Sequence, residues 1–203
     1  MERGGGITIG LHFAGASEIG KAKVKGIIFN LVNEVVVGTY GEDAWDDILD
    51  AAGLDGSYTS LGSYPDDDLF RLVGAASTAL ESDPQHVIRI LGEGAIPLLA
   101  QRYPDFFAHD RTRSMLLTLN DIIHPEVRKL YPGADVPVFD FDTSVGDDRL
   151  VLGYQSPRKL CALAEGFIRG TATHFGERVT IEQPQCMHSG APACSLVCEF
   201  TPA

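Results

Sequence analysis

Positive charge is scarce in this sequence. Its 203 residues include 16 lysines and arginines against 28 aspartates and glutamates, which gives a formal net charge of −12. An acidic surface of this kind repels phosphate backbones and anionic lipids, so we expect neither nucleic acid nor a membrane surface as a partner. No apolar run reaches the about 18 residues that a membrane span requires. These features are typical of a cytoplasmic globular protein.

The chain also lacks the usual signatures of catalysis. It has no phosphate-binding glycine loop, no metallohydrolase motif and no recognisable pair of nucleophile and base. Internal repeats and low-complexity tracts are absent as well. We therefore expect a ligand-binding protein and not an enzyme.

The first 23 residues differ from the rest of the chain. They contain six glycines and little amphipathic pattern, whereas regular apolar periodicity begins at Val24. The segment 1–23 is typical of a disordered extension. It also has features of a weak secretory signal, and a third interpretation places the native start at Val24. The folded domain is expected to span residues 24–203.

Apolar residues recur at helical spacing through the first half of this domain. The pattern predicts helices over 25–41, 42–54, 65–82, 84–104 and 111–134, the fourth interrupted by Gly92, Gly94 and Pro97. The period then changes to alternation, which predicts strands over 136–145, 149–155, 178–187 and 193–200, with one helix inserted over 157–176. This order indicates an α+β fold, with a helical N-terminal subdomain followed by an antiparallel sheet.

Three hydrogen-bonding side chains precede the inserted helix. Ser156 and Pro157 form a helix-start signal, and the free N–H groups of a helix N-terminus attract anions. Arg158 adds a forked cation, and Tyr154 points to the same face of the strand as Ser156. Together they predict a carboxylate or phosphate receptor beside an apolar helix face. An ordinary capped helix with a surface arginine is the alternative.

A ligand with two carboxylates and a large flat apolar body suits such a receptor, and haem is one example. Haem also needs an iron ligand, for which His124 is the best placed histidine. It lies in a helical pattern that puts Leu117 and Val127 on its face, and Pro125 follows it and loosens the helix locally. On this pattern alone, His124 is either a hydrogen-bonded core histidine or a metal ligand.

The two motifs together resemble one known family. The Tyr-x-Ser-x-Arg motif at 154–158 begins some 30 residues after His124, the first residue of the stretch HPEVRKLYP. This arrangement is similar to the haem nitric oxide/oxygen-binding (H-NOX) domain, the sensor module of soluble guanylate cyclase and its bacterial relatives. The stretch KGIIF at 25–29 resembles the start of that domain. The resemblance covers about residues 24–200.

The resemblance implies a cofactor and a set of contacts. The cofactor is haem b, and His124 is expected to be the proximal ligand of its iron. Tyr154, Ser156 and Arg158 would bind the propionates. Pro137 matches a proline that presses on the porphyrin, and Ile28 matches an apolar residue against the haem.

The family also implies a function. Members that bind oxygen stably carry a distal tyrosine five residues after the motif arginine, where this chain has Leu163. A pocket lined by Leu163, Phe167 and Ile28 offers no hydrogen bond to oxygen, so it should favour nitric oxide and carbon monoxide. We expect a non-catalytic gas sensor that signals to a separate protein, such as a histidine kinase, a diguanylate cyclase or a phosphodiesterase.

Cysteine offers a second candidate site. Three of the four cysteines lie near the C-terminus, where Cys186, His188, Cys194 and Cys198 follow the spacing C-x-H-x5-C-x3-C. Thiolate and imidazole ligands suit tetrahedral zinc, and some bacterial relatives of the H-NOX domain carry a zinc or redox-active thiol site in this region. Free thiols, buried core cysteines and a redox-formed disulfide are the alternatives.

Two other functions therefore stay open from the sequence. One is a zinc or thiol redox sensor in which haem is secondary or absent. The other is a carrier for an amphipathic carboxylate ligand.

Overall fold

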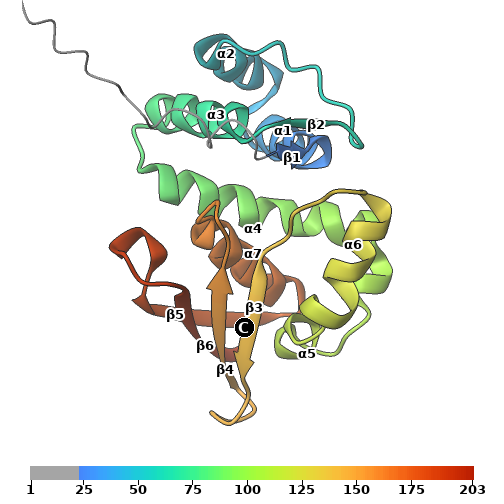
Figure 1. Ribbon diagram of the computed structural model, residues 1–203, viewed down its shortest axis with the longest axis vertical. Coiled ribbons are helices and arrows are strands. Elements are labelled where there is room, and N and C mark those ends of the chain that lie inside the picture. The colour runs from blue at the N-terminus through green and yellow to red at the C-terminus, as the bar shows by residue number, and fades with distance from the viewer. Residues whose placement is uncertain (1–22) are drawn as a thin grey trace, which may run out of the picture.

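A computed structural model describes residues 23–203 of the chain (Figure 1). The expected extension over residues 1–23 lies outside the described residues, apart from Lys23. The α+β prediction is confirmed, because a group of helices precedes an antiparallel sheet that carries one inserted helix. The elements in the N-terminal half are β1 (Lys23–Lys25), α1 (Gly26–Tyr40), α2 (Glu42–Ala52), β2 (Ser63–Pro65), α3 (Asp66–Ala79) and α4 (Pro84–Arg102).

The C-terminal half contains short helices and the main sheet. Its elements are η1 (Pro104–Phe107), α5 (Thr112–Leu116), η2 (Leu119–Ile123), α6 (His124–Leu130), β3 (Val138–Asp142), β4 (Arg149–Gln155), α7 (Cys161–His174), β5 (Glu177–Gln185), η3 (Met187–Ser189) and β6 (Cys194–Pro202). No described helix is both long enough and apolar enough to cross a membrane.

Helix α4 lies between the other N-terminal helices and the C-terminal half of the molecule. Figure 1 shows α1, α2 and α3 on one side of α4, and α7 with the sheet on the other. A core around Phe29, Trp45 and Leu72 holds the N-terminal helices together. Burying large apolar side chains of this kind contributes roughly 1.5–3 kcal/mol each.

The main sheet has the strand order β3-β4-β6-β5 and is antiparallel throughout. Alternate residues of its central strands are fully buried on the face that α7 covers, including Leu150 and Leu152 of β4 and Leu196 of β6. Tyr154 pairs with Cys194 in the register of β4 and β6. This pairing places the motif tyrosine beside the first cysteine of the last strand.

Glycines let α4 and α7 approach each other closely. A Cβ atom at Gly166 would overlap the backbone carbonyl of Arg89, and one at Gly170 would lie 2.7 Å from the carbonyl oxygen of Glu93. Pro97 lacks the N–H that would normally bond to that same Glu93 carbonyl. The predicted interruption at the glycines and Pro97 is therefore wrong: α4 is one continuous helix, and its glycines serve packing.

Two other helix predictions need correction. The expected helix over 111–134 is divided into α5, the π-helical turn η2 and α6. Pro125 has no N–H for the carbonyl of Asp121, and the backbone N–H of His124 donates instead to Leu119, five residues back. The second correction concerns the inserted helix, which begins at Cys161 and not at Pro157.

Replacing Gly166 with alanine should destabilise the protein, because the added methyl group meets backbone that cannot move aside. We expect a loss of about 1–3 kcal/mol in the free energy of unfolding, the usual cost of overpacking. Gly38→Ala is the matched control, since a Cβ there meets nothing within 4 Å, and it should gain about 0.5–1 kcal/mol. Denaturant unfolding measures both, and equal stabilities of the two variants would contradict the close α4–α7 contact.

Candidate functional site

A cavity of about 310 Å³ lies between the helical half and the sheet. This volume falls at the lower end of the range of about 300–1,000 Å³ that is usual for small-molecule pockets. Apolar side chains from α1, α4, η2, α6 and α7 form most of its wall. The residues that the sequence nominated for haem binding all line this cavity, namely Ile28, His124, Pro137, Tyr154, Ser156, Arg158, Leu163 and Phe167.

His124 opens helix α6 and is only 9% exposed. Its ring stacks on Phe139, with 5.7 Å between the ring centroids. Burial, together with the nearby charge of Arg128, lowers the pKa of His124 from 6.5 to about 4, and no hydrogen bond within residues 23–203 contributes to this shift. The imidazole is therefore neutral near pH 7, and its nitrogen lone pair is available to a metal.

The local hydrogen bonds explain where the motif side chains lie. Tyr154 is buried on the inner face of β4, and its hydroxyl accepts a hydrogen bond of 3.0 Å from the backbone N–H of Leu160. Ser156 Oγ accepts from the backbone N–H of Arg158 at 3.3 Å. Because α7 begins only at Cys161, Ser156 is not its N-cap. The receptor therefore consists of side chains at a turn and not of a helix N-terminus.

Arg158 is the positive charge of this receptor. Its Nε donates to Asp66 Oδ2 at 2.7 Å, and its Nη1 donates to the backbone carbonyl of Asp135 at 3.0 Å and to Asp135 Oδ2 at 3.1 Å. Its Nη2 donates to the carbonyl of Lys23 at 2.8 Å. Four of the five guanidinium N–H groups thus have partners within residues 23–203, and one is left to bind a ligand.

Asp66 and Asp135 were missed by the sequence reasoning. Asp66 lies 92 residues before Arg158, and three consecutive acids at the start of α3 are typical of a helix N-terminus. The side chains of Arg158 and Asp66 are only 8% and 11% exposed, whereas that of Asp135 is 58% exposed. Asp66 Oδ1 is buried without a partner in the described part of the chain. The pair therefore joins α3 to the motif in a site where water is largely excluded.

The cavity suits a flat apolar group with carboxylates at one end. Its wall is apolar, its polar end holds Tyr154, Ser156 and Arg158, and His124 lies in the wall with a neutral ring.

Comparison with known proteins gives the same result. The haem-NO-binding (HNOB) family matches residues 25–183. An H-NOX protein from S. oneidensis in the Fe(II)NO ligation state is 34% identical, with a TM-score of 0.81 and coverage of 88% of this chain and 99% of that chain. The chain belongs to the H-NOX family.

Two further H-NOX structures support this assignment. The H-NOX domain from Shewanella oneidensis in the Fe(II)CO ligation state is 34% identical, with a TM-score of 0.79 over 88% of this chain and 99% of that chain. An Fe(II) unliganded H-NOX mutant from K. algicida is 25% identical, with a TM-score of 0.78 over 88% and 97%. The family and the fold expected from the sequence are therefore confirmed. H-NOX domains are haem-based gas-sensor domains and not catalytic domains.

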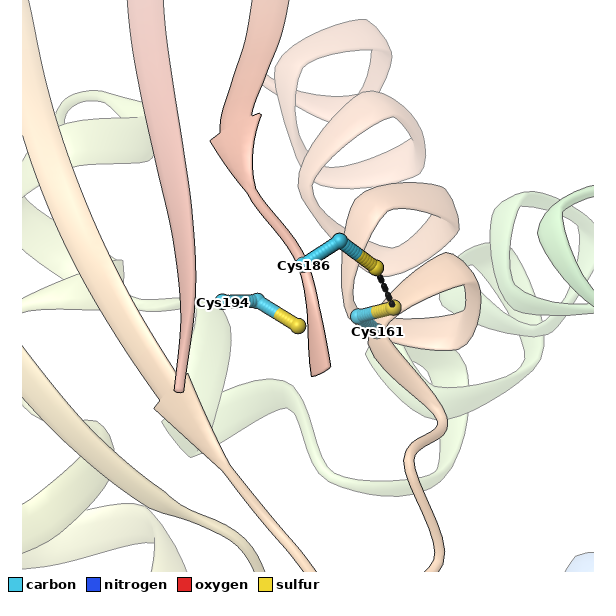
Figure 2. Close-up of side chains that lie close together, drawn as sticks. All are labelled: Cys161, Cys186 and Cys194. Carbon is cyan, nitrogen blue, oxygen red and sulfur yellow. Dashed lines mark hydrogen bonds between the residues drawn. The ribbon is translucent and has the colours of Figure 1, made fainter. Parts of the chain in front are cut away.

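A cluster of three thiols lies at the N-terminal end of α7. Figure 2 shows the side chains of Cys161, Cys186 and Cys194 pointing toward one another from the start of α7, the residue directly after β5 and the start of β6. Their sulfur atoms lie within 4.8 Å of one another, and 3.9 Å separates Cys161 Sγ from Cys186 Sγ. This spacing is close enough for three ligands of one metal ion.

The thiol cluster differs from the zinc ligands that the sequence nominated. Cys186 and Cys194 are brought together as expected, but His188 Nε2 contacts the backbone carbonyl of Lys159 at 2.8 Å. Cys198 lies four residues after Cys194 on a continuous strand, which separates their Cα atoms by about 13 Å. Because Cys194 and Cys198 are an even number of residues apart, their side chains lie on the same face of β6, but too far apart to share one site. Cys161 is the third member of the cluster. It lies at the start of α7, 25 residues before Cys186, so the spacing of the C-terminal cysteines did not reveal it.

The three thiols are not equivalent. Burial raises the pKa of Cys161 to about 12. Burial also acts to raise the pKa of Cys186, but hydrogen bonds from the backbone of His188 and from neighbouring thiols outweigh it and lower this pKa. Cys186 is therefore more readily ionised than Cys161, which makes it the better nucleophile of these two.

Arg158→Ala should destabilise the protein, because it leaves Asp66 buried without its partner. Breaking a buried pair in this way costs about 3–5 kcal/mol. We also expect this variant to retain less haem than Lys159→Ala, which changes an exposed residue at the same turn. Thermal unfolding of the apoprotein and haem content after reconstitution measure the two effects. Equal losses in both variants would indicate a general charge effect and not a specific contact of Arg158.

Proposed function

We propose that this protein is a haem-based sensor that selects nitric oxide and carbon monoxide over oxygen. The observation that carries this proposal is the neutral, buried ring of His124 in the wall of an apolar cavity whose polar end holds Arg158. The alternative of a hydrogen-bonded core histidine fits less well. The pKa of His124 is lowered by burial and by the charge of Arg128, and no hydrogen bond from residues 23–203 contributes to this lowering.

The cavity residues would divide the binding of haem b among them. His124 would ligate the iron, while Arg158, Tyr154 and Ser156 would bind the propionates. Ile28 and Pro137 line the same cavity from α1 and from the loop before β3, where they can contact the faces of the ring. When bound, haem supplies an iron centre with one open position for a diatomic gas.

The gas preference follows from the side chains of α7. Leu163 and Phe167 line the cavity one helical turn apart and offer no hydrogen bond. Bound oxygen carries partial negative charge and gains from a donor, whereas nitric oxide depends on it far less. Thr171 is the one hydroxyl that α7 contributes to the cavity wall, and it lies a further turn along the helix.

Signalling would begin at helix α6, because it carries His124. A change in the bond between His124 and the iron would alter the position of this helix relative to the sheet. A separate protein would read the change, and a histidine kinase or a cyclic-di-GMP enzyme (a diguanylate cyclase or a phosphodiesterase) is the kind of partner that we propose.

Replacing His124 with glycine tests the assignment of the iron ligand. The variant should lose most of its haem and recover it when free imidazole is added, because the small molecule occupies the space of the missing ring. His86→Ala is the control, since His86 lies exposed on α4. Haem content and the absorption spectrum provide the measurement. Histidine-ligated haem in the glycine variant without imidazole would refute the role of His124.

The gas preference yields a separate prediction. The ferrous protein should bind nitric oxide but form no stable complex with oxygen in air. One hydrogen bond to a charged acceptor, at about 1.5–3 kcal/mol, changes affinity by roughly one to two orders of magnitude. Leu163→Tyr should therefore raise oxygen affinity by about that factor, as measured by absorption spectroscopy. A stable oxygen complex of the unmodified protein would contradict this account and make Thr171 the donor to test.

The thiol cluster supports a second candidate function, that of a zinc or redox sensor. Three sulfur atoms within 4.8 Å of one another could supply three of the four ligands of a tetrahedral zinc site. Zinc bound there would take its fourth ligand from solvent or from a rearranged side chain. Without zinc, Cys161 and Cys186 are the pair closest to disulfide formation, at 3.9 Å between their sulfur atoms.

The zinc content of cysteine variants tests this second function. Cys161→Ala should lower the zinc bound per chain to near zero, because two remaining thiols hold zinc weakly. Cys198→Ala should leave the zinc content unchanged, since the strand geometry separates Cys198 from the cluster. Zinc analysis after dialysis against a mild chelator gives the readout. Unmodified protein without zinc would leave only the redox form of this proposal, and loss of zinc in the Cys198 variant alone would show that the cluster is not the site.

A further inference from the structure

The segment that carries His124 is attached to the rest of the protein at both of its ends. On the N-terminal side, the π-helical turn η2 runs directly into His124. Within this turn, Asn120 Nδ2 donates a hydrogen bond of 2.6 Å to the backbone carbonyl of Phe139 on β3. Because the ring of Phe139 also stacks on His124, the same residue contacts the segment through its backbone and through its side chain.

The C-terminal attachment is formed by two tyrosines. Tyr131 is the C-cap residue directly after α6, and its hydroxyl hydrogen-bonds to that of Tyr103, the C-cap residue directly after α4. Both tyrosines line the cavity and are half-buried. Burial and the contact with Tyr103 raise the pKa of Tyr131 to about 12, so the hydroxyl keeps its proton at neutral pH. Helix α4 is in turn fixed by its close contact with α7.

Other contacts of α6 do not have this effect. Lys129 pairs with Glu126 inside the same helix, so this ion pair moves with α6 and cannot restrain it. Val127 contributes apolar packing against the third core cluster, which is not directional. The two hydrogen bonds are therefore the directional restraints that connect the segment 119–131 to the sheet on one side and to α4 on the other.

We propose that Asn120 and Tyr131 are positioning residues for His124, which hold its imidazole in one place in the cavity wall and so would make its bond to a haem iron easier to lose when nitric oxide binds. This inference rests on the proposed function of His124. A ring that is held at both ends of its segment could not shift to preserve a bond to the iron, so that bond would be lost more readily. Releasing either end of the segment would let the ring adjust, and the bond would then survive gas binding more often.

The test compares Asn120→Ala, Tyr131→Phe and Tyr103→Phe with the unmodified protein. Each variant removes one hydrogen bond and leaves the proposed iron ligand in place. We expect the ratio of six-coordinate to five-coordinate nitric oxide complex to rise roughly fivefold, the factor that corresponds to one hydrogen bond of about 1 kcal/mol. Electron paramagnetic resonance and absorption spectra of the ferrous nitric oxide complex measure this ratio.

Two comparisons separate positioning from a general loss of structure. Tyr103→Phe and Tyr131→Phe remove the same bond from opposite sides, so each alone and both together should give the same ratio. Tyr40→Phe, at an exposed tyrosine of α1, should leave the ratio unchanged. Hydrogen exchange of the apoprotein provides a readout without haem, since amides of residues 124–131 should exchange faster in the Asn120 and Tyr131 variants than in the Tyr40 control.

The outcomes distinguish failure of the positioning role from failure of the proposed sensor function. If the unmodified protein shows no histidine-ligated haem, the proposed function fails. If the unmodified protein loses the histidine bond on binding nitric oxide and the three variants do so to the same extent, the positioning role is overturned while the sensor function stands. If one of the two tyrosine variants does not fold, the variant of the other tyrosine decides the result, because it removes the same hydrogen bond.

Discussion

The contact between α4 and α7 is the interaction on which the other features of this protein depend. The two helices meet backbone to backbone, because Gly166 and Gly170 leave no side chain between them and the carbonyls of α4. Helix α4 belongs to the helical half and contributes Ile96 and Leu99 to the cavity, while α7 covers the sheet and contributes its own apolar face. A larger residue at the crossing would push the halves apart and change the cavity that lies between them.

Polar contacts then fix the halves at the edge of this cavity. The guanidinium of Arg158 bridges β1, α3 and the loop before β3 through Lys23, Asp66 and Asp135. A buried ion pair contributes little net stability but is costly to break, so its main effect is to set one relative position of its partners. The thiol cluster lies near this region of the motif, because Cys194 pairs with Tyr154 across β4 and β6 and Cys161 begins α7.

Much of this arrangement could be predicted from the sequence, since periodicity and short motifs carry local information. Alternating apolar residues located the four strands of the sheet, and the motif from Tyr154 to Arg158 identified a polar site whose members do line one cavity. The prediction failed where distant residues decide the outcome. Asp66 and Arg158 lie 92 residues apart, and Cys161 reaches the other thiols only because α7 packs on the sheet. The break before His124 depends on backbone hydrogen bonds that shift by one residue just before Pro125, and apolar spacing alone does not reveal this shift.

The central claim is that this chain holds haem through His124. Resonance Raman spectroscopy of the reconstituted ferrous protein, without added gas, tests it most directly, because the iron–histidine stretching band is seen only in a five-coordinate haem with an imidazole ligand. The account predicts this band in the unmodified protein and its disappearance when nitric oxide is added. The claim would be contradicted if the protein took up no haem, or if its ferrous haem complex showed no iron–histidine band.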